Sequence, residues 1–125
     1  MTAKIVKPNS NWHRLVHLLD RNGGMLYLAQ LYKPKMGQAG HPEVIRDMPL
    51  LTEYSLMRGR ASMGYERQAE RMGWVNIQRR RNRVWVTLLP KGRDVLRAFA
   101  DGKKWNTQED RPVLELHKVV INLQT

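Results

Sequence analysis

The feature that most restricts the possible folds is an alternation of apolar residues on both sides of a short basic segment. The apolar positions are Val75, Ile77, Val84, Val86 and Leu88. A period of two is typical of strands with one buried face. Between the two runs lies the segment 79–83, in which four of the five residues are arginine. We therefore predict a β-hairpin with a basic tip.

A helix is predicted on each side of this hairpin. The apolar positions before the hairpin are Ala61, Tyr65, Ala69 and Met72. They recur at helical spacing as far as Gly73, which predicts a helix over 60–72. After the hairpin, Pro90 suits a first helical position, and an apolar stripe predicts a helix that continues to about Phe99.

The N-terminal half predicts short helices joined by loops. Residues 1–9 form a basic lead-in that we expect to be flexible, and Ser10 offers an N-cap for a first helix. An apolar stripe then predicts a second short helix from Met25 to Tyr32. Pro42 to Met48 could add one or two further helical turns.

One domain is expected in a chain of 125 residues. We place it over 10–101 and expect 102–125 to hold a polar linker and a C-terminal helix. That helix is predicted to begin at Pro112, and its apolar stripe suits dimerisation or packing on the chain's own core.

The charge is strongly positive and concentrated around the hairpin. The chain has 22 Lys and Arg residues against 11 Asp and Glu residues, a net charge of +11. Ten Lys and Arg residues and two Glu residues lie between Arg58 and Arg93, so eight of the eleven net charges lie in this segment. A concentrated basic segment favours a polyanionic partner, nucleic acid above all.

The order helix, glycine, strand, basic turn, strand and helix between Ala61 and Phe99 resembles the DNA-binding domain of MarR-type transcription regulators. The matching parts are the helix Arg60 to Met72 with Gly73-Trp74-Val75, the turn 79–83, and the segment Val86 to Arg93. In that last segment Leu89-Pro90 stands where the family commonly has Thr and its neighbour.

This resemblance implies a winged helix-turn-helix, a mainly α fold with a small β-hairpin (α+β). It also implies a transcription regulator that binds double-stranded DNA as a dimer, with the helix 60–72 in the major groove and the basic wing 79–83 on the backbone or in the minor groove. Both Met25 to Tyr32 and Leu50 to Met57 could be the positioning helix, and the sequence leaves the choice open.

The candidate DNA-binding residues are basic or polar positions on the predicted helix and wing. They are Arg58, Arg60, Ser62, Met63, Glu66, Arg67, Arg71, Arg79, Arg80, Arg81 and Arg83. Arginine can contact guanine edges or phosphates, and Ser and Glu can reach base edges. Glu66 and Glu70 could instead form surface ion pairs with Arg67 and Arg71.

Trp74 and Trp85 bracket the wing, and we expect them to pack the small sheet. The alternative is that they stack on bases, as in a single-strand or RNA binder. A second alternative is a small phage-type inhibitor that binds an acidic protein partner.

Catalysis and cofactors are not expected. The sequence has no nucleophile-histidine-acid set, P-loop or dinucleotide fingerprint, and His13 and His17 lack an evident third metal ligand. The absence of cysteine excludes disulfides and thiolate zinc sites. No apolar run is long enough to span a bilayer, so we expect a cytoplasmic protein with no membrane partner.

Overall fold

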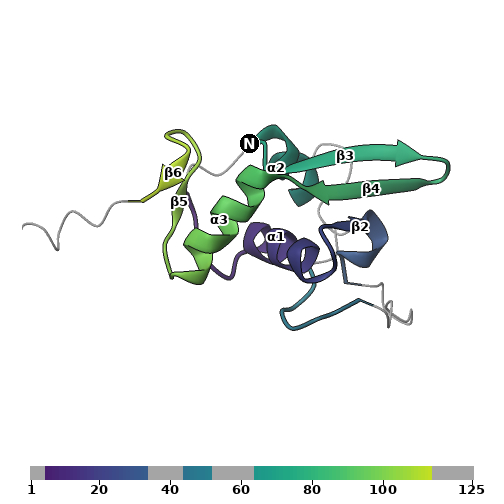
Figure 1. Cartoon of the computed structure of the whole chain (residues 1–125), viewed down its shortest axis with the longest axis horizontal. Helices are drawn as coiled ribbons and strands as arrows, with labels where there is room; N and C mark the ends of the chain where they lie inside the picture. The colour runs from purple at the N-terminus through teal and green to yellow at the C-terminus, as the bar shows by residue number, and fades with distance from the viewer. Residues whose placement is uncertain (1–4, 34–43, 52–63, 114–125) are drawn as a thin grey trace, which may run out of the picture.

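The computed structural model describes residues 5–33, 44–51 and 64–113 (Figure 1). The helices in these ranges are α1 (Asn11–Arg21), α2 (Tyr65–Arg71) and α3 (Pro90–Ala100), with a single 3-10 turn, η1 (Leu28–Gln30). The strands are β1 (Ile5–Val6), β2 (Met25–Tyr27), β3 (Val75–Arg80), β4 (Arg83–Leu88), β5 (Trp105–Asn106) and β6 (Arg111–Pro112).

The larger sheet has the strand order β2-β4-β3 and is antiparallel throughout. The predicted hairpin forms its β3–β4 pair, in a register that joins Val75 to Leu88 and Arg80 to Arg83. The hairpin extends well beyond the helices, to the right in Figure 1. Its base therefore lies at the core and its tip projects away from it.

The smaller sheet has the order β1-β5-β6 and corrects the predictions for both ends of the domain. The supposedly flexible lead-in includes β1, whose Val6 is buried against the core. The supposed linker includes β5 and β6, and Trp105 of β5 is buried. Pro112 lies in β6 rather than at a helix start, and residues 114–125 of the predicted C-terminal helix lie outside the described residues.

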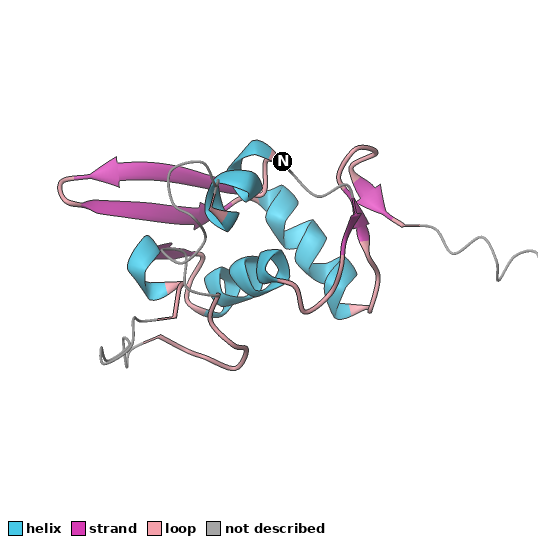
Figure 2. Cartoon of the chain, turned by 180° about the vertical axis from the view of Figure 1, so that it is seen from behind, coloured by secondary structure: helices cyan, strands magenta, loops and turns pink. Residues whose placement is uncertain are grey.

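The core lies between the two sheets, where the helices gather (Figure 2). Helix α1 supplies four completely buried apolar side chains and contacts α2, α3 and β4. Trp74, just before β3, is also completely buried and meets Phe99 of α3 edge to face, with ring centroids 6.3 Å apart. Trp74 is thus a packing residue, as the sequence predicts.

Helix α1 begins and ends where its sequence dictates. The Ser10 hydroxyl accepts a hydrogen bond from the His13 backbone N–H at 3.4 Å, which caps the first turn. After Asn22 the chain passes through Gly23 and Gly24, both with positive φ, a conformation that glycine adopts without strain. The chain reverses there and enters β2.

The prediction of a mainly α fold with one small hairpin is wrong. The described residues form three helices and two three-stranded antiparallel sheets, an α+β arrangement, and a winged helix-turn-helix is not confirmed. The range Met25 to Tyr32 is not one α-helix: its first residues form β2, where Leu26 pairs with Val86 and is buried, and Leu28–Gln30 form the 3-10 turn η1. Of the range 50–57, only Leu50 and Leu51 are described, and neither is helical.

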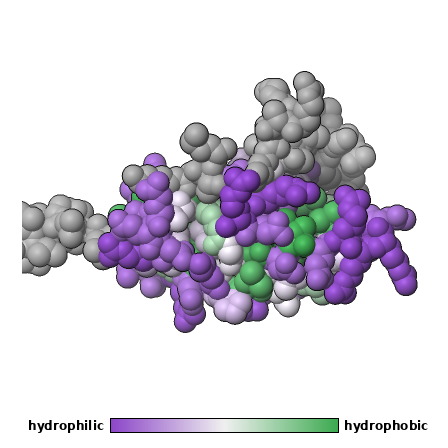
Figure 3. All heavy atoms as spheres, turned by 90° about the horizontal axis from the view of Figure 1, so that it is seen from above, coloured by the Kyte–Doolittle hydropathy of each residue, from purple (hydrophilic) through white to green (hydrophobic). Residues whose placement is uncertain are grey.

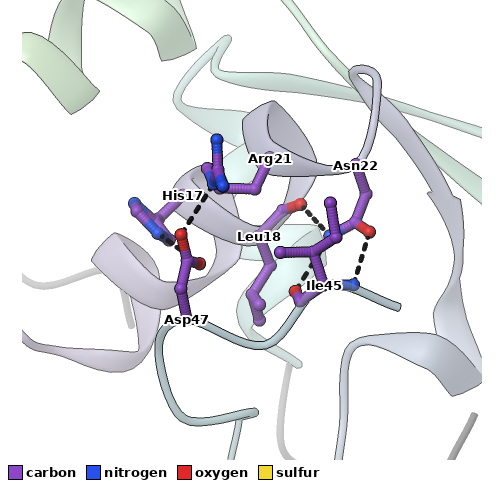
Figure 4. Close-up of polar contacts among 6 residues, drawn as sticks. All are labelled: His17, Leu18, Arg21, Asn22, Ile45 and Asp47. Atoms are coloured by element: carbon purple, nitrogen blue, oxygen red, sulfur yellow. Dashed lines mark hydrogen bonds and ion pairs between the residues drawn. The ribbon is translucent and has the colours of Figure 1, made fainter. Parts of the chain in front are cut away.

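The segment 44–51 is held against α1 by polar contacts (Figure 4). The Asn22 amide accepts from the Ile45 N–H at 2.8 Å and donates to the Ile45 carbonyl at 3.2 Å. Asp47 contacts His17 at 2.9 Å and Arg21 at 2.6 Å. The hydrogen bond from His17, and then the contacts of Arg21, lower the pKa of the Asp47 carboxyl.

The helical turns predicted between Pro42 and Met48 are absent from 44–48, the part of that range that the structure describes. Two backbone hydrogen bonds instead tie Leu51 to the neighbouring segment, one from its N–H to Leu31 and one from Lys33 to its carbonyl.

No helix in the described ranges is long and apolar enough to cross a membrane.

Candidate nucleic-acid interface

Helix α2 is positioned by a buried polar contact at its first turn. The Tyr32 hydroxyl donates to Glu66 Oε1 at 2.5 Å and accepts from the Tyr65 N–H at 3.1 Å. Glu66 is only 3% exposed, so the prediction that it faces a DNA groove is wrong. A carboxylate buried in this way needs a hydrogen-bond donor, and Tyr32 supplies one from a segment 34 residues earlier in the chain.

The predicted helix over 60–72 is longer than α2. Gly64 has an extended backbone, with φ −63° and ψ 161°, and α2 begins only at Tyr65. A Cβ at position 64 would lie 2.5 Å from the Glu66 carboxylate, so a larger residue there would displace the carboxylate that Tyr32 holds. Arg58, Arg60, Ser62 and Met63 of the predicted interface lie outside the described residues.

The remaining face of α2 agrees with the prediction. Ala69 is completely buried, and the Tyr65 ring packs edge to face on Trp12, with centroids 5.2 Å apart. Arg67 and Arg71, one turn apart, are exposed. Their side chains are therefore accessible to a large partner.

The predicted ion pairs of Glu66 and Glu70 with Arg67 and Arg71 are not among the salt bridges of the described residues. Glu66 is buried, and Glu70 Oε2 accepts from the Ile77 N–H at 3.2 Å. This contact joins the end of α2 to β3 and leaves the charge of the two arginines uncompensated by the acidic residues of their own helix.

The hairpin tip consists of Arg79, Arg80, Arg81, Asn82 and Arg83, all of them exposed. Arg80 donates to the Gln78 side chain at 3.0 Å, and the Arg83 guanidinium carbon lies 4.5 Å from the centre of the Tyr27 ring. Arg81 has a φ of 56°, in the left-handed region that favours glycine.

The tip carries four closely spaced positive charges without a described carboxylate partner. Five basic side chains elsewhere form salt bridges with carboxylates: Arg21, Lys91, Arg93, Arg97 and Arg111. Within the described ranges, no arginine of the tip belongs to such a pair. In Figure 3 long hydrophilic side chains extend at the right-hand end of the molecule, the end to which the hairpin points in Figure 1.

Sequence reasoning missed Tyr27, which joins the hairpin through strand β2. Tyr27 pairs with Trp85 of β4, and the two rings meet edge to face at 5.5 Å. A run of three strand residues carries too little periodicity to show this pairing in advance. The available signal was that both segments contain an aromatic residue, Tyr27 in one and Trp85 in the other.

Comparisons of this chain with protein-family models, with curated proteins and with solved structures gave no match. The likeness to MarR-type regulators therefore stays an expectation from the sequence, and the proposals below depend on the geometry and charge of the described residues.

Proposed function

We propose that this chain binds double-stranded DNA and acts as a transcription regulator. In this proposal the hairpin tip contacts the phosphate backbone, and the exposed face of α2, with Arg67 and Arg71, lies against the same duplex. The cytoplasm would be its compartment, as the sequence predicts.

The observation that carries the proposal is the unpaired charge of the tip. Four arginines lie within five residues, and none has a carboxylate partner among the described residues. Arg80 and Arg83 are also directly opposite each other in the hairpin register, where like charges destabilise a strand pair. Closely spaced phosphates would neutralise this charge and release counterions, which favours binding.

The position of α2 supports a contact shared with the hairpin. Helix α2 packs against the base of β3, and the Glu70 contact with Ile77 fixes their relative orientation. A basic helix face and a basic hairpin held together rigidly can contact adjacent parts of one duplex. Dimer formation through residues beyond 113 is a further expectation from the sequence.

The test is the salt dependence of duplex binding by an Arg79→Gln/Arg81→Gln double variant. Each phosphate contact contributes about 0.9 to the slope of log K against log salt concentration. We expect the slope to fall by about 1.8 on random duplexes, with an unchanged melting temperature. Lys103→Gln, which removes an exposed charge after α3, is the control. Its slope of log K against log salt concentration should stay close to that of the wild type.

Two results would refute duplex binding by the tip. One is an unchanged slope in the double variant. The other is loss of DNA binding in competition with an acidic protein or polyglutamate at equal charge concentration, which would favour the protein-inhibitor alternative.

A further inference from the structure

The larger sheet has a second face, turned away from the core. In the β2-β4-β3 register, Leu26, Val75, Val86 and Leu88 share one face and are buried. Because side chains alternate along a strand, the residues between them share the opposite face. This outer face comprises Met25, Tyr27, Asn76, Gln78, Arg80, Arg83, Trp85 and Thr87.

Trp85 lies at the centre of the outer face but is not required by the core. It is not among the partly buried apolar side chains that pack on the core cluster, whereas Trp12 and Ile77 are. Its described ring contact is with Tyr27, at 5.5 Å and an interplanar angle of 79°. Trp85 is half-buried, so part of its indole stays accessible on the central strand as an aromatic surface on which a planar ring can stack.

The charged residues of the outer face, Arg80 and Arg83, are both positive. Arg83 lies over the Tyr27 ring, Arg80 lies opposite Arg83, and the outer face contains no Asp or Glu. Gln78 pairs with Trp85 on its other side, so one row across the sheet contains a phenol, an indole and an amide. Adjacent strands lie about 4.8 Å apart, so this row spans roughly 10 Å.

We propose that the outer face binds single-stranded nucleic acid by stacking an unpaired base on Trp85. Arg80 and Arg83 would contact the neighbouring phosphates, and the Gln78 amide, which can both donate and accept, would contact the base edge. The site goes beyond duplex binding, because the base faces of a duplex are already stacked on each other. It differs from the tip contact in requiring an aromatic ring, which phosphates alone do not need.

The experiment measures fluorescence anisotropy of labelled oligothymidylate and oligouridylate of about 12 nucleotides with the full chain. Trp85→Leu is expected to weaken binding of both by about tenfold or more, the effect of one lost stacked base. Its affinity for a duplex of equal length should change less than about twofold, since the phosphate contacts remain. Circular dichroism reports whether the variant is folded.

Trp85→Phe keeps an aromatic ring in β4 and is the second variant. It should retain most of the single-strand affinity even if Trp85→Leu unfolds, and its binding should no longer quench the emission that Trp85 contributes in the wild type. Equal affinities of wild type and folded Trp85→Leu would overturn the proposal. So would an absence of quenching in the wild type, or tighter binding of an acidic peptide than of either oligonucleotide.

The two proposals can fail separately. Arg79 and Arg81 are not outer-face residues. If their double variant binds duplexes with an unchanged salt dependence, duplex binding by the tip is refuted, but the effect of the Trp85 substitutions still decides whether the single-strand site exists. Conversely, if the Trp85 substitutions do not change the single-strand affinity, the single-strand site is refuted and the test of duplex binding is unaffected.

Discussion

One substitution at Arg81, in the turn of the hairpin, is expected to change stability and the proposed duplex binding in opposite directions. Its φ of 56° places a residue with a Cβ in the left-handed region, which costs about 1–2 kcal/mol. Glycine adopts this conformation freely, although it loses about 0.5–1 kcal/mol more conformational entropy on folding. Arg81→Gly is therefore expected to raise the free energy of unfolding by up to about 1.5 kcal/mol, the largest difference between these two terms.

The same substitution removes one exposed guanidinium from the tip. Duplex affinity should fall, and the slope of log K against log salt should decrease by about 0.9 for the lost phosphate contact. Urea denaturation followed by tryptophan fluorescence gives the stability, and a gel shift at several salt concentrations gives the slope. A more stable protein that binds DNA more weakly is the expected combination.

Arg80→Gly is the matched control. It removes the same charge one residue earlier, but Arg80 lies in β3 and is not among the residues with positive φ. Glycine there should destabilise the protein by roughly 0.5–1 kcal/mol. If Arg81→Gly destabilises the protein to the same extent, the left-handed backbone of Arg81 stores no strain. If Arg81→Gly leaves the slope of log K against log salt unchanged, the tip does not contact phosphate.

Three further predictions concern the core that supports the interface. Tyr32→Phe removes the donor to the buried Glu66 carboxylate and should lower the free energy of unfolding by about 1–3 kcal/mol, measured by urea denaturation. Gly92→Ala would place a Cβ 2.4 Å from the Trp74 carbonyl oxygen, so we expect a loss of about 1–3 kcal/mol, seen as a lower melting temperature. Burial, and secondarily the nearby second histidine of α1, lowers the pKa of His13 from 6.5 to about 4, which favours its neutral form in the fold. The contribution of neutral His13 to the free energy of unfolding should therefore be fully present above pH 6.5, and the free energy should fall by up to about 3 kcal/mol as the pH drops towards 4. In a pH series of denaturation curves, His13→Gln should show a weaker dependence of this free energy on pH.

The elements predicted correctly are those whose signal lies within one short stretch of sequence. The hairpin follows from alternating apolar residues, and the start of α1 follows from the N-cap that Ser10 offers. Helix α3 begins at Pro90, where a proline at the first position predicts it. In each case the local period and the boundary residues agree.

The elements predicted wrongly depend on contacts between distant parts of the chain. The stripe from Met25 to Tyr32 fits a helix, but pairing of Leu26 with Val86 extends its first residues into a strand. Strands β1, β5 and β6 have two residues each, too few to show any period.

The candidate interface shows the same division between local and distant information. The exposed arginines of the tip follow from composition and the turn alone. The burial of Glu66 depends on Tyr32, and the aromatic outer face depends on the pairing of Tyr27 with Trp85. Neither partner could be assigned before the order of the strands was known.

The hairpin has a packed base and an exposed, charged tip. At its base, Val75 and Leu88 pair within the core, whereas the tip lies beyond the helices and contributes almost nothing to apolar burial. The tip is therefore free to concentrate charge that would destabilise a packed region. Arg80 and Arg83 belong both to the tip and to the outer face, so an anion bound at one site reduces the positive potential at the other. Two separate nucleic acids would thus weaken each other's binding. A duplex that continues into a single strand would instead occupy both sites with one molecule, and the covalent link between its two parts would raise its affinity.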